Sequence, residues 1–88
     1  MKIRDGFILR KMAGSDYLIP TGNNIAYFNG IISLNQTALF LWKHLQAGMD
    51  ERVIMEEFVK EYDITIEKAR EDIGLFLNQL RQASLLED

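Results

Sequence analysis

The feature that most constrains the fold of this chain is a short apolar strand, residues 31–34, that runs into an amphipathic helix without a linker. Asn35 stands at the junction, where its side-chain oxygen can accept a hydrogen bond from a free backbone N–H of the first helical turn. Asn29 and Gly30 just upstream are a strong signal for a two-residue hairpin turn, since a type I′ turn needs positive φ at both central residues. We therefore predict a rigid strand–helix corner, preceded by a hairpin that joins residues 25–28 to residues 31–34.

Two further apolar-rich runs, Phe7–Met12 and residues 16–21, lie upstream with a short Ala-Gly-Ser segment between them. Gly and Ser between two such runs are typical of a hairpin turn, so we expect these strands to pair. Pro20 lacks the N–H that a sheet ladder needs, and we therefore place it at the end or the free edge of its strand.

Three amphipathic helices are expected after the strands. The first spans about residues 36–46, with Trp42 at the centre of the core and its indole N–H bonded to a backbone acceptor. Asp50 is predicted to cap the second helix, and Thr65 the third, which is the longest. The buried stripe of the third helix is predicted to comprise Ile66, Ala69, Ile73, Phe76, Leu77 and Leu80. Together these elements predict an α+β fold, a small winged helix-turn-helix-like domain in which N-terminal antiparallel β-strands are followed by three α-helices.

Length and composition are those of one ordinary globular domain, which we assign to residues 1–88. Hydrophobic residues make up 48% of the chain and charged residues 26%, a balance that argues against a disordered tail. Cys is absent, so disulfides and thiolate metal sites are excluded. The N-terminus lacks the apolar run of a signal peptide, and no run is long enough to span a bilayer. We therefore expect a cytoplasmic protein that makes no membrane contact.

Charge is spread unevenly along the chain. Residues 1–48 carry five basic and two acidic side chains, a net charge of +3, whereas residues 49–88 carry five basic and eleven acidic side chains, a net charge of −6. Binding to nucleic acid depends on neutralising phosphates, and an acidic helical half opposes it. We therefore expect no nucleic-acid partner.

No residue pattern indicates catalysis, a metal site or a cofactor. His44 is the single histidine, and no nucleophile or second ligand is suggested near it. The carboxylates of Glu56, Glu57, Glu61 and Asp63 spread around the second helix, as expected for a solvated face. The sequence contains neither a Gly-rich phosphate loop nor a dinucleotide fingerprint. We predict that the protein is not an enzyme and holds no cofactor and no metal.

Several segments share a pattern with one known family. These segments are Leu34-Asn35-Gln36-Thr37-Ala38, Trp42, Glu61-Tyr62-Asp63-Ile64, Asp72-Ile73-Gly74-Leu75-Phe76-Leu77-Asn78-Gln79-Leu80 and Leu85-Leu86. Through them the chain resembles the PqqD family, from about Arg4 to Leu86. It departs from the family at Ser84, where members typically have Gly, and at Gln36, where they often have Glu.

The resemblance implies a RiPP recognition element. Such a protein is a chaperone that holds the leader segment of a ribosomally made precursor peptide and presents it to a modifying enzyme, commonly a radical S-adenosylmethionine enzyme. In related structures the leader adds as a strand beside the third strand, in the groove bordered by the third helix. On this sequence that groove lies between residues 31–33 and the third helix. The residues that it implies for peptide binding are Ile31, Ile32, Ser33, Arg70, Ile73, Gly74, Leu77 and Arg81.

The residues themselves are compatible with this role. An exposed strand edge can pair with an extended peptide. Arg70 and Arg81 flank the buried stripe, where their heads can reach solvent or the carboxylates of an acidic leader. Gly74 can permit another backbone to approach closely. Leu75 lies opposite the buried stripe, so it is either a contact for a partner enzyme or a second copy of the chain, or simply an isolated exposed leucine.

Alternatives to peptide binding stay open. The apolar residues of the 31–34 strand can pack entirely in the core, leaving no site. A winged-helix DNA-binding transcriptional regulator would share the fold, although the exposed face of the third helix offers three acids to one base. A homodimer joined through Leu75 or an edge strand is the third alternative.

Overall fold

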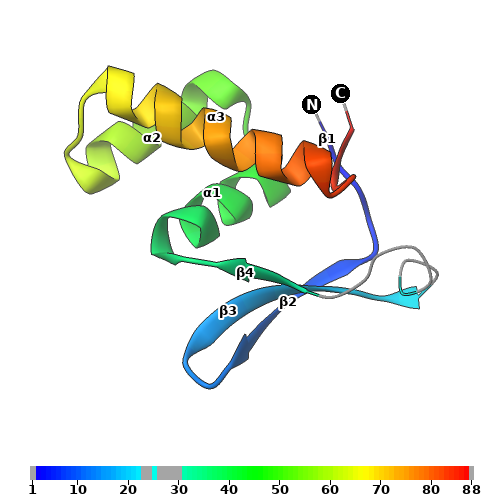
Figure 1. The fold of residues 1–88 in the computed structure, drawn as a ribbon. Helices are drawn as coiled ribbons and strands as arrows, with labels where there is room; N and C mark the ends of the chain where they lie inside the picture. The colour runs from blue at the N-terminus through cyan, green and yellow to red at the C-terminus, as the bar shows by residue number, and fades with distance from the viewer. Residues whose placement is uncertain (1, 23–24, 26–30, 88) are drawn as a thin grey trace.

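The fold is given by a computed structural model, which describes residues 2–22, 25 and 31–87 (Figure 1). In chain order the elements are β1 (Lys2–Ile3), β2 (Phe7–Met12), β3 (Ser15–Pro20), β4 (Ile32–Leu34), α1 (Gln36–Gln46), α2 (Glu51–Tyr62), α3 (Ile66–Gln82) and β5 (Leu86–Glu87). A three-stranded antiparallel sheet is followed by three helices, which confirms the predicted α+β fold. The more specific winged helix-turn-helix assignment stays a prediction.

The sheet has the order β2-β3-β4. Ala13 and Gly14 join β2 to β3 with φ angles of 51° and 82°, the two positive values that a type I′ hairpin turn requires. This confirms the predicted hairpin, although β3 begins one residue earlier than expected. Pro20 is the last residue of β3, as predicted. The expected hairpin between residues 25–28 and 31–34 falls largely outside the described residues, and β4 begins at Ile32.

The side chain of the residue before each helix caps it, as predicted. The backbone N–H of Ala38 donates to Asn35 Oδ1 at 2.9 Å, and the N–H of Val53 donates to Asp50 Oδ1 at 3.0 Å. The N–H of Lys68 donates to Thr65 Oγ1 at 3.1 Å. Each bond satisfies a donor that the first turn of a helix leaves unpaired, and this explains why the helix starts could be located from sequence.

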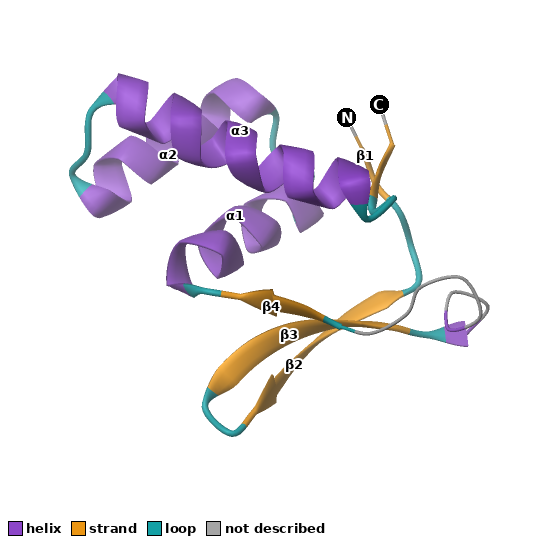
Figure 2. Ribbon diagram, viewed as in Figure 1, coloured by secondary structure: helices purple, strands orange, loops and turns teal. Residues whose placement is uncertain are grey.

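All three helices lie on one side of the sheet (Figure 2). Leu18 and Leu34 of the sheet meet the helices in a core with Trp42 and Phe58. Trp42 is 1% exposed, which confirms its predicted position, but its indole N–H has no hydrogen-bond partner among the described residues. Contrary to the prediction, its place is therefore set by apolar packing rather than by a hydrogen bond.

The buried stripe of α3 is confirmed at Ala69, Ile73, Phe76, Leu77 and Leu80. Ile66 was expected in this stripe, but 54% of it is exposed. It is the first residue of α3, directly after the turn that joins α2 to α3. Helical periodicity predicts the direction of a side chain, but whether a neighbouring element covers that side chain depends on the packing of the helices.

A second, two-stranded pairing closes the chain and was not predicted. Ile3 of β1 lies opposite Leu86 of β5, and the Arg4 N–H donates to the Leu85 carbonyl oxygen at 2.8 Å. The two ends of the chain consequently lie side by side (Figure 1). None of the described helices is both long enough and apolar enough to cross a membrane.

Candidate functional site

The two edges of the sheet differ in their chemistry. The edge strand β2 carries Arg10 and Lys11 near its middle, and charged side chains on an edge oppose pairing with another strand. The edge strand β4 has the sequence Ile-Ser-Leu and carries no charge. Among the described residues, no strand pairs with the outer edge of β4. An extended peptide would therefore meet fewer obstacles at β4 than at β2.

The type I′ turn fixes which backbone groups of β3 face which neighbour. Met12 and Ser15 flank the turn and therefore form a hydrogen-bonded pair, in which each residue donates to the other. Hydrogen-bonded and non-hydrogen-bonded pairs alternate along an antiparallel ladder. The odd-numbered residues of β3 therefore direct their N–H and C=O groups toward β2, and the even-numbered residues direct theirs toward β4.

The same alternation orients the backbone of β4. Ile32 and Leu34 pair with even-numbered residues of β3, so their backbone groups are used within the sheet. Ser33 lies opposite Tyr17 in a non-hydrogen-bonded pair. The N–H and C=O groups of Ser33 therefore point to the outer edge of β4, where they can pair with an added strand.

A hollow of about 240 Å³ lies between the start of α1 and the middle of α3, beside the end of β4. Leu41 and Phe76, both buried, and the half-buried Ala38 are its apolar lining, and Leu75, 65% exposed, stands at its rim. Its remaining lining residues are the polar Asn35, Thr37, Asp72 and Gln79. We call this hollow, together with the outer edge of β4, the candidate groove.

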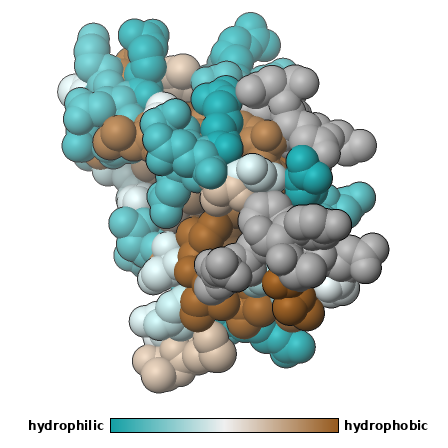
Figure 3. All heavy atoms as spheres, turned by 45° about the vertical axis from the view of Figure 1, so that its right-hand side comes forward, coloured by the Kyte–Doolittle hydropathy of each residue, from teal (hydrophilic) through white to brown (hydrophobic). Residues whose placement is uncertain are grey.

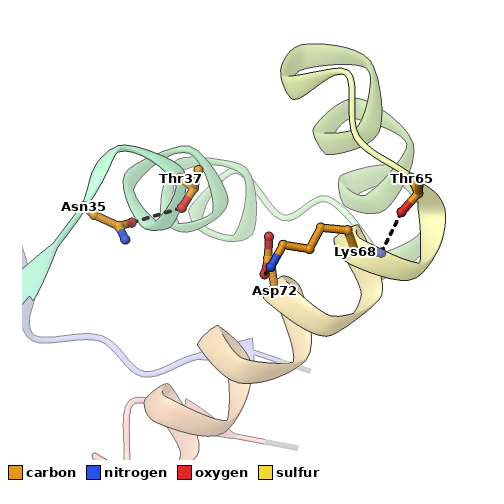
Figure 4. Close-up of polar contacts among 5 residues, drawn as sticks. All are labelled: Asn35, Thr37, Thr65, Lys68 and Asp72. Carbon is orange, nitrogen blue, oxygen red and sulfur yellow. Dashed lines mark hydrogen bonds and ion pairs between the residues drawn. The ribbon is translucent and has the colours of Figure 1, made fainter.

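Three of the four polar lining residues, Asn35, Thr37 and Asp72, have hydrogen-bond or ion-pair partners (Figure 4). Thr37 Oγ1 donates to Asn35 Oδ1 at 3.0 Å, and Lys68 Nζ lies 3.1 Å from Asp72 Oδ1. The hydrogen bond to Asp72 and the negative charges of Asp72 and Glu71 raise the pKa of Lys68 above its ordinary value of 10.5. The hollow thus combines an apolar floor with a rim of hydrogen-bonding groups.

The predicted peptide-binding residues differ in how exposed they are to a bound peptide. Ser33 is exposed on β4, Ile32 is half-buried against the core, and Ile31, just before β4, is 48% exposed. Ile73 and Leu77 are 3% and 4% exposed, so their side chains are used in the core. They can support the wall of a groove from behind but offer little surface to a peptide.

Three other predicted residues, Arg70, Gly74 and Arg81, are exposed on α3. With 3.6 residues per turn they share one flank of the helix, separated by the buried stripe from the residues that line the hollow. Leu75 is exposed as predicted, and the structure places it at the hollow. The other hollow-lining residues of α3, Asp72, Phe76 and Gln79, were not among the predicted peptide contacts. Together with Leu75 they are spaced at i, i+3, i+4 and i+7, and this spacing could have shown from the sequence that they share one face of the helix.

His44 is half-buried and stacks on Phe40, with ring centroids 4.0 Å apart. Its Nδ1 lies 2.8 Å from the Phe40 carbonyl oxygen. In the described part of the chain, no group of three or more His, Cys, Asp or Glu side chains is placed to hold a metal ion. The histidine thus contributes to packing between α1 and α2, where Phe40 also contacts Phe58 and Tyr62.

An uncharged strand edge beside a hollow with an apolar floor is a geometry that can accept an extended peptide as an added strand. Comparison with protein families matches residues 18–86 to the family described as Coenzyme PQQ synthesis protein D (PqqD). The chain belongs to the PqqD family, as its sequence resemblance indicated.

One solved structure with the same fold is described as TbiB1 in complex with the TbiA(beta) leader peptide. It aligns with a TM-score of 0.80 and 22% sequence identity, over 99% of this chain and 95% of that chain. No curated protein matches the sequence.

Proposed function

We propose that this protein binds the leader segment of a ribosomally synthesised precursor peptide and presents it to a modifying enzyme. The leader adds as a strand to the outer edge of β4, with side chains entering the hollow between α1 and α3. The observation that carries the proposal is the uncharged β4 edge, with the backbone groups of Ser33 turned outward, beside that hollow. Membership of the PqqD family and the leader-bound protein of similar fold support it.

Energies show why both parts of the candidate groove are needed. Two backbone hydrogen bonds to Ser33 contribute about 1–3 kcal/mol, at a net ~0.5–1.5 kcal/mol each. Micromolar affinity requires about 8 kcal/mol. Burying one apolar side chain in the hollow adds about 1.5–3 kcal/mol. Apolar anchors of the leader must therefore supply the larger share, and at least two of them are needed.

The size of the hollow indicates what enters it. Pockets for drug-sized ligands or cofactors are typically about 300–1,000 Å³. At about 240 Å³ the hollow is smaller and suits side chains of the leader. We also propose that the protein is a non-catalytic cytoplasmic partner, and that the modifying enzyme, proposed to be a radical S-adenosylmethionine enzyme, performs the chemistry.

The proposed contacts combine sequence and structure. Ser33 supplies backbone groups, while Leu75, Phe76 and Gln79 provide the helical wall. Ile31 and Ile32 remain proposed contacts along the strand, and Arg70, Gly74 and Arg81 remain proposed contacts on the other flank of α3. Ile73 and Leu77 are assigned a supporting position behind the wall.

Calorimetric titration with a synthetic peptide of the leader segment of the cognate precursor tests the proposal. Replacing Leu75 by Asp places an unpaired charge at the rim of the hollow and should weaken leader binding by about tenfold or more. The matched control is Ile66→Asp, which alters an apolar residue of α3 with similar exposure outside the hollow. Wild-type protein that binds no leader, or a loss of binding in Ile66→Asp but not in Leu75→Asp, would contradict the proposal.

A further inference from the structure

The face of the sheet turned away from the helices is rich in apolar side chains. Because side chains alternate across a strand, Leu18 and its neighbours Leu9 and Ile32 face the core. The outer face of the sheet therefore comprises Ile8, Arg10 and Met12 of β2, Ser15, Tyr17 and Ile19 of β3, and Ser33 of β4. Ile8 is 37% exposed and Met12 is 42% exposed.

The pairs across the strands make this face continuous. Ile8 lies directly opposite Ile19, and Arg10 lies opposite Tyr17. All three helices are on the other side of the sheet (Figure 2). Hydrophobic side chains gather on the sheet part of the molecule, whereas the helical part is mostly hydrophilic (Figure 3). Exposed apolar side chains on a sheet face that no helix covers make this face a candidate interaction site.

Charge indicates the chemistry of the partner. Arg10 is the charged residue of the outer face, and the neighbouring Lys11 is already paired with Asp16, at 3.8 Å. The face is therefore apolar with a positive charge, and a complementary surface has an apolar centre and an acidic group opposite Arg10.

Charge argues against a second copy of this chain. A sheet-to-sheet dimer would use the same face of both copies and bring the two Arg10 side chains onto one interface. The face measures about 20 by 15 Å, roughly 300 Å², from the spacing of residues and strands. A standard interface needs about 800 Å² from each partner. The occupant must therefore reach beyond this face.

The outer face is continuous with the candidate groove at Ser33. The side chain of Ser33 belongs to the outer face, while its backbone groups point to the edge where the leader is proposed to add. A protein docked on the outer face that reaches past β4 would contact the bound leader directly, which extends the interface to the required size.

We infer that the outer face of the sheet docks the modifying enzyme through a surface of that enzyme with an apolar centre and an acidic rim. This inference rests on the proposed function, because the enzyme is the partner to which the leader is presented. The leader then occupies the outer edge of β4 and the hollow, while the enzyme occupies the outer face of the sheet. Both can be bound at once.

The probe is the purified modifying enzyme encoded beside the precursor peptide, with binding measured by biolayer interferometry. Ile8→Glu and Met12→Glu each introduce an acidic charge into the apolar part of the outer face, and each should weaken enzyme binding by about tenfold or more. Arg10→Glu should weaken it further at low salt, and Arg10→Lys should restore most of the binding. Ile66→Glu, an exposed isoleucine on the helical side, is the matched control and should leave enzyme binding unchanged.

Three readouts separate the outcomes. Circular dichroism confirms folding, and titration with the leader tests the proposed function independently of the enzyme. Weaker enzyme binding by the outer-face variants, with leader affinity unchanged, supports the inference. Enzyme binding equal to that of the wild type in all folded outer-face variants would overturn it. A dimer seen by light scattering in the wild type and lost in Met12→Glu would also overturn it, because the occupant would then be a second copy.

Discussion

Ser33 lies opposite Tyr17 in a non-hydrogen-bonded pair of the β3–β4 ladder, so the backbone N–H and C=O of Ser33 point to the outer edge of β4. The immediate neighbours, Ile32 and Leu34, use their backbone groups inside the sheet. A backbone change at Ser33 should therefore affect the outer edge, whereas the same change one position away, at Ile32 or Leu34, should affect the fold. Sequence alone could not assign this parity, because it depends on the turn between β2 and β3.

Leu75 and Phe76 are adjacent in sequence but should respond differently to substitution. Leu75 is 65% exposed, and Leu75→Ser should change the free energy of unfolding by no more than about 0.5 kcal/mol. Phe76 is 5% exposed, and Phe76→Ala should lower the stability by about 3–5 kcal/mol. Urea denaturation of both variants measures these values. A larger loss for Leu75→Ser than for Phe76→Ala would mean that α3 is rotated from its position here.

Ser84 is predicted to be a suboptimal residue at the end of α3. Its φ is 59°, a left-handed conformation. The Ser84 N–H donates to the Arg81 carbonyl oxygen, and the Leu85 N–H donates to the Leu80 carbonyl oxygen. These two hydrogen bonds define a helix ending that usually has Gly at this position. Ser84→Gly should stabilise the protein by about 1 kcal/mol, because Gly adopts this conformation without strain. Ser15→Gly, in strand β3, is the control and should destabilise it. A decrease in melting temperature for Ser84→Gly would contradict the assigned conformation.

The Lys68–Asp72 pair predicts a pH effect at alkaline pH. Because the pKa of Lys68 is raised in the folded state, its contribution to stability is complete below 10.5 and is lost as the pH rises through the folded-state value. Thermal melts of the wild type and Asp72→Asn should therefore differ at neutral pH and converge above pH 10.5. Lys68 is exposed, so the difference should be small. A difference that widens with rising pH would contradict the assignment.

The protein is predicted not to bind DNA specifically. The acidic C-terminal half repels the phosphate backbone, because its eleven acidic side chains outnumber its five basic ones. A mobility-shift assay at low salt should show at most weak binding that does not depend on sequence. Tight, sequence-selective and salt-sensitive binding would favour the winged-helix regulator instead.

Local signals explain what could be predicted from the sequence. Asn35, Asp50 and Thr65 located the helix starts because a capping side chain acts within one turn. Gly14 marked the β2–β3 hairpin because the turn needs positive φ. The exposed position of Leu75 followed from helical periodicity alone.

Features that depend on residues far apart in sequence could not be predicted. The β1–β5 pair has two residues in each strand, too few for any periodic pattern. The hollow is formed by α1 and α3, and its location depends on how these helices pack. For the same reason the sequence could not show that Arg70 and Arg81 lie on the flank of α3 away from the hollow. The burial of Ile73 and Leu77, by contrast, followed from helical periodicity.

Strand addition at β4 is tested most directly by proline substitution at Ser33 and Ile32. Proline removes a backbone N–H. Ser33→Pro removes an N–H that faces the outer edge, so the variant should fold, as judged by circular dichroism. The same variant should bind the leader at least about tenfold more weakly in calorimetric titration, because a backbone hydrogen bond is lost and the proline ring obstructs the edge.

Ile32→Pro removes an N–H used inside the sheet and should destabilise or unfold the protein. Weak leader binding by a folded Ser33→Pro variant, together with a damaged fold in Ile32→Pro, is the result that strand addition predicts. A folded Ser33→Pro variant that binds the leader with the affinity of the wild type would contradict it.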